Sequence, residues 1–186
     1  SSATARDDLF PGVYVFALAY AGGDALWVGT NHGAFRFDPA KRTATPIAVD
    51  TGHGNGLPGL AVRSLLAARD GSIWFGTFGQ GLAHWIPAAA GQPEHWQQFR
   101  HRASDADSLA SDIVVTLMQD GEGRIWIGTT DGLSVFDPGK GKLHTLRHDP
   151  SNPDSLSDNL IRSLLQSGDG TLWIGTDSMG LFRISS

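Results

Sequence analysis

One tetrapeptide constrains the fold of this chain more than any other feature. Trp-x-Gly-Thr, in which x is Val, Phe or Ile, occurs four times, beginning at Trp27, Trp74, Trp126 and Trp173. The tryptophans are 47, 52 and 47 residues apart, and self-similarity at a nearly fixed period of this size indicates a repeat architecture. The sequence therefore predicts four copies of one structural unit.

Apolar side chains keep the same phase within each copy. A β-branched residue stands twelve positions before each Trp, a Leu nine before, and a large apolar residue seventeen before. In chain order these sets are Val15, Val62, Val114 and Ile161; Leu18, Leu65, Leu117 and Leu164; and Phe10, Leu57, Leu109 and Leu156. Such agreement without gaps implies that the copies share their packing as well as their motif.

Each copy reads as a set of short strands. In the fourth, an apolar stretch at 161–165 precedes Gly168-Asp169-Gly170, a tight hairpin turn, and a second strand at 172–176 follows. A third strand comes after the next Gly, and a polar fourth strand is legible in two copies, at 95–100 and 142–146. Each repeat is therefore predicted to be a four-stranded antiparallel meander.

Both faces of the first strand are apolar. Simple alternation places Val62, Ser64 and Leu66 on one side and Leu65 on the other, so these sheets are expected to be covered on both sides. Meanders of this period, packed between neighbours, are typical of β-propeller blades. We predict an all-β chain, one propeller segment over 1–186, with blades at about 10–50, 57–102, 109–148 and 156–186. The last blade is expected to lack its outer strand, which leaves an open arc of a larger propeller.

Composition excludes several classes of protein. The 186 residues include no Cys, so disulfide frameworks and Cys-based zinc sites are impossible, and no apolar run is long enough to span a bilayer. The formal charge of −5 argues against a nucleic-acid surface, and no membrane contact is expected. The first residues have no basic and apolar leader pattern, so we expect any secretory signal to lie outside this sequence.

The fourth repeat resembles the two-component regulator propeller repeat almost throughout, from Ser155-Leu156 to Gly180-Leu181, and the third ends similarly with Val135-Phe136-Asp137. The first two repeats depart from that pattern at Leu9-Phe10-Pro11-Gly12 and Gly56-Leu57-Pro58-Gly59. The resemblance implies a periplasmic sensor region of a bacterial membrane receptor, of the kind joined to histidine kinases or diguanylate cyclases. It also implies rings of more than four blades, so we expect self-association through the open blade faces.

Candidate ligand-binding residues gather where the loop after the second strand meets the loop into the first strand of the next blade. They are Arg63, Arg162, His32, Phe78, Asp131 and Asp177. Two guanidiniums at the mouth of a propeller could grip a carboxylate or a sugar acid by paired hydrogen bonds, or they could pair with neighbouring Asp residues and hold the ring together. The second interpretation is favoured.

Several motif matches fail on context. The G-x-G-x-x-G at 54–59 contains Pro58 and precedes a strand rather than a helix, so it is no dinucleotide site. Residues 104–109 begin like a calcium loop but have no Gly at its sixth position and no closing Glu, so Asx-type turns are favoured there and a loose, weak cation site is the alternative. His101 and His148 occupy equivalent positions, which indicates scaffold, and Trp85 and Trp96 could stack on a sugar or pack between blades. No catalytic, metal-binding or cofactor-binding residues are predicted.

These observations favour a non-catalytic sensor module that binds an unknown small molecule or glycan and biases an attached signalling domain. Two alternatives stay open: a propeller lyase or hydrolase that acts on a glycan or cyclic peptide, and a pure interaction scaffold. Fold alone does not choose between them.

Overall fold

The computed structural model describes residues 9–23, 25–89 and 91–184 of the chain. Within these residues fifteen strands form and no helix does. The strands make four antiparallel sheets, and each sheet is a meander in which consecutive strands pair. The prediction of an all-β chain of propeller blades is therefore confirmed.

The strand bounds follow the repeats closely. The first blade contains β1 (Val15–Tyr20), β2 (Leu26–Thr30), β3 (Gly33–Asp38) and β4 (Thr43–Pro46). The second contains β5 (Val62–Ala67), β6 (Ile73–Thr77), β7 (Leu82–Ile86) and β8 (His95–Phe99). The third contains β9 (Val114–Gln119), β10 (Ile125–Thr129), β11 (Gly132–Asp137) and β12 (Lys142–Leu146). The fourth contains β13 (Ile161–Gln166), β14 (Leu172–Thr176) and β15 (Leu181–Ile184).

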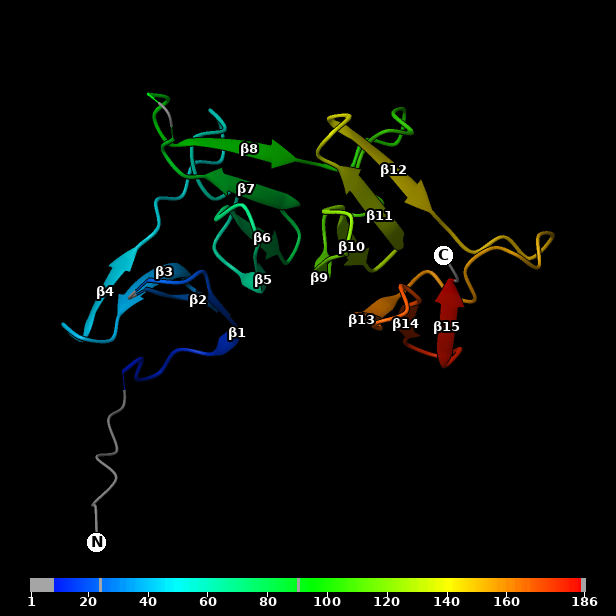
Figure 1. The fold of residues 1–186 in the computed structure, drawn as a ribbon, viewed down its shortest axis with the longest axis horizontal. Helices are drawn as coiled ribbons and strands as arrows, with labels where there is room; N and C mark the ends of the chain where they lie inside the picture. Colours follow the sequence, from blue (N-terminus) through cyan, green and yellow to red (C-terminus); the bar gives the residue numbers. More distant parts are fainter. Residues whose placement is uncertain (1–8, 24, 90, 185–186) are drawn as a thin grey trace, which may run out of the picture.

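The four sheets stand side by side like the sectors of a fan (Figure 1). The first strands, β1, β5, β9 and β13, converge on a common centre, where each contacts the next, and the later strands of each blade lie progressively further out. The ribbon traces an open arc rather than a closed ring (Figure 1). The outer strand of the first blade, β4, was not legible in the sequence because its residues, Thr-Ala-Thr-Pro, are all exposed and show no apolar pattern.

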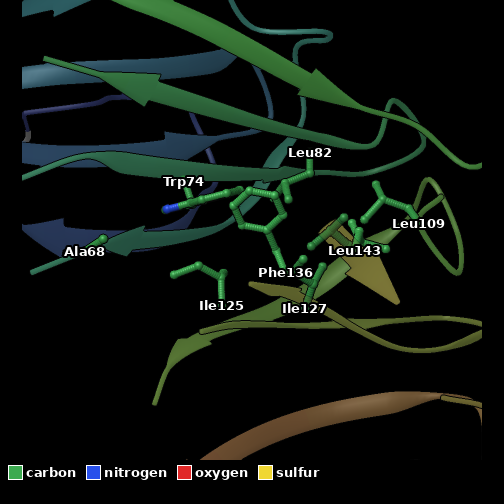
Figure 2. Packing of buried hydrophobic residues seen from close by; sticks show 9 residues of the cluster. Ala68, Trp74, Leu82, Leu109, Ile125, Ile127, Phe136 and Leu143 are labelled. Carbon is green, nitrogen blue, oxygen red and sulfur yellow. The ribbon is translucent and has the colours of Figure 1, made fainter. Parts of the chain in front are cut away.

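The repeated Trp packs between blades. Between the second and third blades, Trp74 and Leu82 face Phe136, Ile125 and Ile127 of the next sheet (Figure 2). The side chain of Leu109, which precedes the third blade, joins this cluster and is 1% exposed. Equivalent clusters form around Trp27 with Leu57 and around Trp126 with Leu156. In these three interfaces the residue seventeen positions before the Trp of a blade therefore packs that blade against the preceding one.

The Gly of each tetrapeptide lets the next blade come close. A Cβ built on Gly128 would stand 2.5 Å from Thr116 Cγ2 and 2.7 Å from Ile161 Cγ2 of the following blade. The space that this Gly leaves is filled by a β-branched side chain, Ile161, which is fully buried. Any side chain here would push the blades apart, which explains why this position does not vary.

The loops between blades are fastened by a repeated histidine. The Nδ1 atoms of His101 and His148 lie 2.6 Å from the carbonyl oxygens of Leu109 and Leu156, respectively. Each imidazole ring therefore bonds the backbone of the leucine that packs the following blade against the blade before it. This geometry agrees with the interpretation of both histidines as scaffold.

Candidate functional site

Each first strand carries a β-bulge at the same place. The pairing register skips one residue between Val15 and Ala17, between Val62 and Ser64, and between Ile161 and Ser163, and β9 shows the same shift before Thr116. A bulge leaves its extra residue out of the ladder and re-aims the side chains around it. The four residues left out are Phe16, Arg63, Val115 and Arg162.

The bulge corrects the side assignment that simple alternation gave. A Cβ on Gly29 of the first blade would meet both Val62 and Leu65, so these two side chains face the same neighbour. Ser64 instead lies against Gly76, on the other side of the sheet. The extra residue at Arg63 reverses the alternation, and Val62 and Ser64 therefore point to opposite faces.

The bulged residue is the variable one in an otherwise constant stretch. The residue before it is always Val or Ile, and the residue after it is always small, whereas the bulge itself carries Phe, Arg, Val or Arg. The residues on either side of the bulge pack on the two faces of the blade, and the bulged residue lies between them outside the ladder. The fold thus presents one side chain of variable chemistry per blade, at the same end of the arc.

A second variable residue faces each bulge. It follows the second strand, and its backbone N–H donates to the carbonyl of the residue that precedes the first strand, over 2.9 to 3.2 Å. These residues are Asn31, Phe78, Thr130 and Asp177. We call these four, with the four bulge residues, the mouth.

In the second blade, Arg63 lies over an aromatic ring. Its guanidinium carbon is 5.9 Å from the ring centroid of Phe78, whose side chain is 54% exposed. Arg63 itself is half-buried. Among residues 9–23, 25–89 and 91–184 no carboxylate comes within ion-pair distance of this guanidinium. The pair combines a positive charge and an exposed apolar surface.

In the fourth blade, the equivalent arginine is neutralised. Arg162 Nε donates to Asp177 Oδ1 over 2.7 Å, and Nη2 lies 2.6 Å from the same oxygen. Both side chains are nearly half exposed, so this ion pair adds little to the free energy of unfolding. Of the two predicted interpretations, pairing with Asp fits Arg162, and Arg63 is the guanidinium left for other contacts.

The remaining two candidates lie one residue further into the same turns. The backbone N–H groups of His32 and Asp131 donate to Thr30 Oγ1 and Thr129 Oγ1, over 3.0 and 3.1 Å. The carboxylate of Asp131 is 3.5 Å from Arg147 Nε. The structure therefore brings four of the six candidates together as two pairs, Arg63 with Phe78 and Arg162 with Asp177. Of the other two, Asp131 lies beside Arg147, and His32 is held by its backbone bond to Thr30.

Trp85 and Trp96 pack between the first two blades. The ring centroid of Trp85 is 5.2 Å from that of Trp27, and the centroid of Trp96 is 5.5 Å from that of Phe75. Both rings also border an open cleft with Arg36 and Glu94. The packing interpretation of these two residues fits the contacts.

In the part of the chain that the structure describes, no three His, Asp or Glu side chains are grouped to hold a metal ion. The same part contains no helix that is long and apolar enough to cross a membrane.

Simple alternation along the first strands did not predict the bulge, although its four residues, Phe16, Arg63, Val115 and Arg162, each stand eleven positions before a repeated Trp. A signal was present in the repeats. A single variable position between a constant β-branched residue and a constant small residue is what an extra, unpaired residue leaves in an ungapped alignment.

Comparison with known proteins identifies the repeats. The model of the family described as two component regulator propeller matches residues 56–79, 108–131 and 155–178. The histidine kinase P4 of Formosa agariphila is 31% identical over 113 residues, which are 60% of this chain and 8% of the kinase. The chain thus spans less than a tenth of the length of this curated relative.

Solved structures share the fold at low identity. The extracellular domain assigned to the hybrid two component system BT3049 of B. thetaiotaomicron superposes with a TM-score of 0.76 at 20% identity, covering 92% of this chain and 23% of that one. PorZ, a surface component of the type-IX secretion system of Porphyromonas gingivalis, gives 0.70 at 16% identity over 100% of this chain and 28% of its own. Virginiamycin B lyase from Staphylococcus aureus gives 0.61 at 11% identity over 94% and 56%.

Proposed function

Since three of its four blades are two component regulator propeller repeats, we propose that this chain is a ligand-binding segment of the extracytoplasmic part of a two-component sensor. Its relative in Formosa agariphila is a histidine kinase, and a structural neighbour is the extracellular domain of a hybrid two component system. In this proposal the chain performs no chemistry itself. It binds a ligand and passes that event to an attached output domain.

The mouth is the proposed ligand site, and the bulge in each first strand is the observation that supports it. The structure holds each blade by the residues on either side of the bulge, and the bulged side chain varies from blade to blade. A surface built from variable side chains on a constant frame suits recognition, because its chemistry can change without disturbing the packing.

The pair of Arg63 and Phe78 indicates what the mouth would recognise. The Arg63 guanidinium, which pairs with no carboxylate of the described residues, offers charged hydrogen bonds to an anion, and the exposed ring beside it offers an apolar contact. A small molecule that carries a carboxylate next to an apolar or sugar-ring face satisfies both. We propose a ligand of this class, which includes sugar acids.

The chain could pass a signal to an attached output domain if its blades pack differently with and without the ligand. A ligand shifts such an equilibrium only as far as its affinities for the two states differ. Four of the mouth residues lie on the first strands, each of which contacts the next, so a ligand that spans two blades would favour one relative position of them.

The similarity to a lyase shows the shared fold alone and brings no activity to this chain. A turnover assay on any ligand that binds would test that alternative.

The test of the ligand site is binding of a matched pair of probes, glucuronate and glucose. We expect glucuronate, and not glucose, to shift the amide resonances of Arg63 and Phe78 in a two-dimensional NMR titration. A charged hydrogen bond contributes about 1.5 to 3 kcal/mol, so Arg63→Ala should weaken glucuronate binding by roughly 10- to 100-fold.

The matched control is Arg69→Ala. Arg69 follows the same strand at its opposite end, where its backbone and side chain bond Gln119. That variant should bind as the unmodified chain does. Glucuronate that causes no shifts at the mouth, or that binds Arg63→Ala and the unmodified chain equally, would contradict the proposed site.

A further inference from the structure

The first two blades leave an open cleft at their outer end. It has a volume of about 390 Å³ and lies between β3 and β4 of the first blade and β7 and β8 of the second (Figure 1). Ligand sites in proteins are typically clefts of about 300 to 1,000 Å³. Further blades of a longer propeller would pack against the first or the fourth sheet, so they would not fill this cleft.

Larger rings stand in this interface than in the next one. Trp85 and Trp96 pair directly across β7 and β8, so both side chains lie on one face of the sheet. The same two positions of the third blade hold Phe136 and Leu143, which are 7% and 5% exposed and belong to the cluster between the second and third blades. Trp85 and Trp96 are only half-buried and border the cleft. Part of each indole ring is therefore open to a ligand.

An arginine lines this cleft at a position where the second blade has a histidine. In the second blade, His84 pairs with Trp74 across the sheet and stacks on its ring, with the ring centroids 3.7 Å apart. In the first blade, Arg36 pairs with Trp27 in the same register, and its side chain is exposed at the cleft. The first blade thus offers a guanidinium to the cleft in place of a stacked ring.

Opposite charges face the cleft from its two sides. Arg36 belongs to the first blade, and Glu94 stands two residues before Trp96 on the second. Both side chains are exposed, and within the part of the chain that the structure describes neither makes an ion pair, with the other or with any third group. One wall of the cleft therefore combines a carboxylate with two indole rings, and the other wall carries a guanidinium.

Hydrogen bonds hold the rim of the cleft in place. Gln98 Nε2, on β8, donates to the backbone carbonyl oxygens of Asp50 and Gly56, over 2.8 and 2.9 Å. The carboxylate of Asp50 accepts a bond from the backbone N–H of Asn55 over 3.2 Å, and Asn55 borders the cleft. The loop between β4 and β5 is thus fastened to the second blade without a ligand, which lowers the entropic cost of binding one.

We propose that this cleft binds a small zwitterion with a quaternary ammonium at one end and a carboxylate at the other, as in the betaines. Methylated ammonium groups bind over the faces of aromatic rings, most strongly over Trp, and the carboxylate of Glu94 adds to this attraction. The guanidinium of Arg36 takes the carboxylate of the ligand by paired, charged hydrogen bonds. No residue of the mouth lines this cleft, so the inference does not rest on the proposed function.

The first test compares γ-butyrobetaine with 5,5-dimethylhexanoate, a molecule of the same shape in which carbon replaces the charged nitrogen. We expect γ-butyrobetaine to shift the indole N–H resonances of Trp85 and Trp96 in a two-dimensional NMR titration. It should bind roughly 5- to 30-fold more tightly than its analogue, because only the quaternary ammonium is attracted to the ring faces. Choline has no carboxylate for Arg36 and should bind roughly 10- to 100-fold more weakly than γ-butyrobetaine.

Two substitutions separate the two ends of the ligand. Arg36→Gln should weaken the binding of γ-butyrobetaine by roughly 10- to 100-fold and leave that of choline unchanged. Glu94→Gln should weaken the binding of γ-butyrobetaine by up to about 5-fold and leave that of 5,5-dimethylhexanoate unchanged. Both positions are exposed, so the blades should fold, which circular dichroism verifies.

The matched control is Arg183→Gln. Arg183 pairs with Trp173 in the fourth blade as Arg36 pairs with Trp27 in the first, and its side chain is also exposed. This variant should bind γ-butyrobetaine as the unmodified chain does. An equal loss of affinity in Arg183→Gln and Arg36→Gln would overturn the proposed site.

Three other results would also overturn the proposal. The first is the absence of shifts at the indoles of Trp85 and Trp96, or shifts confined to the mouth. The second is equal binding of γ-butyrobetaine and 5,5-dimethylhexanoate. The third is tighter binding of cellotetraose at the same two indoles that neither Arg36→Gln nor Glu94→Gln weakens, because a neutral glycan would use the rings without the charges.

Discussion

Gly128→Ala tests whether the tetrapeptide Gly holds the blades together. The added Cβ would stand 2.5 Å from Thr116 Cγ2, in its own sheet, and 2.7 Å from Ile161 Cγ2, in the next blade. Neither neighbour can yield easily, because Ile161 is fully buried and its β-branched side chain is stiff. The fourth blade must therefore move away from the third.

The magnitude follows from two opposing effects. Extra methyl groups in a packed core cost typically about 1 to 3 kcal/mol, whereas replacing Gly by Ala in an allowed backbone conformation stabilises by about 0.4 to 1 kcal/mol through the unfolded chain. Gly128 does not have a positive φ, so the second effect applies. We expect the free energy of unfolding to fall by about 1 to 2 kcal/mol and the melting temperature by about 2 to 8 °C.

The assay is thermal unfolding followed by circular dichroism, with Gly168→Ala as the control. Gly168 also lacks a positive φ, and a Cβ there would meet nothing within 4 Å. The control should melt at or slightly above the temperature of the unmodified chain. Equal melting temperatures of the two variants would refute the argument that the absence of a side chain at Gly128 is what allows the third and fourth blades to pack this closely.

Three further changes test the polar contacts of the blades. Burial lowers the pKa of His84 from 6.5 to about 4, so the unfolded chain binds more protons between these values. The free energy of unfolding should then fall by about 2 to 3 kcal/mol as the pH falls from about 6.5 to 4, and His84→Leu should remove this fall in urea titrations at pH 7 and 4.5. Asp120→Asn should destabilise by about 1 to 3 kcal/mol in the same titrations, because the buried carboxylate accepts a 2.7 Å bond from Trp126 Nε1. His148→Ala should cost about 1 kcal/mol and increase amide hydrogen exchange around Leu156, whose carbonyl the ring binds.

The blades could be predicted from the sequence because their packing is repetitive. In each of the three interfaces the Trp of one copy meets the Leu and the β-branched residue of the next, so the same pattern recurs along the sequence and stands out from chance. Trp74 and Leu109 in one interface have the same relation as Trp126 and Leu156 in the next. The four residues of the outer strand β4 are all exposed, so no apolar pattern marks this strand in the sequence.

The pairing of the arginines could not be predicted, because it depends on which residue follows the second strand. Arg63 and Arg162 occupy equivalent bulges, and each faces the residue fifteen positions later. That residue is Phe78 in one blade and Asp177 in the other, so one guanidinium lies over a ring and the other is neutralised. Equivalent positions in a repeat therefore share geometry without sharing chemistry.

The bulge explains how one position in each blade can vary while the packing stays the same. If the first strand alternated regularly, Val62 and Ser64 would face the same neighbour, and the residue between them would have to pack against the other blade. The extra residue instead sends Val62 to the preceding blade and Ser64 toward Gly76, which secures both faces. Arg63 then carries none of the packing between blades, and a substitution there changes the chemistry of the mouth at little cost to the stability of the arc. The same reasoning applies to Phe16, Val115 and Arg162, so four positions at one end of the molecule can vary without disturbing the contacts between blades.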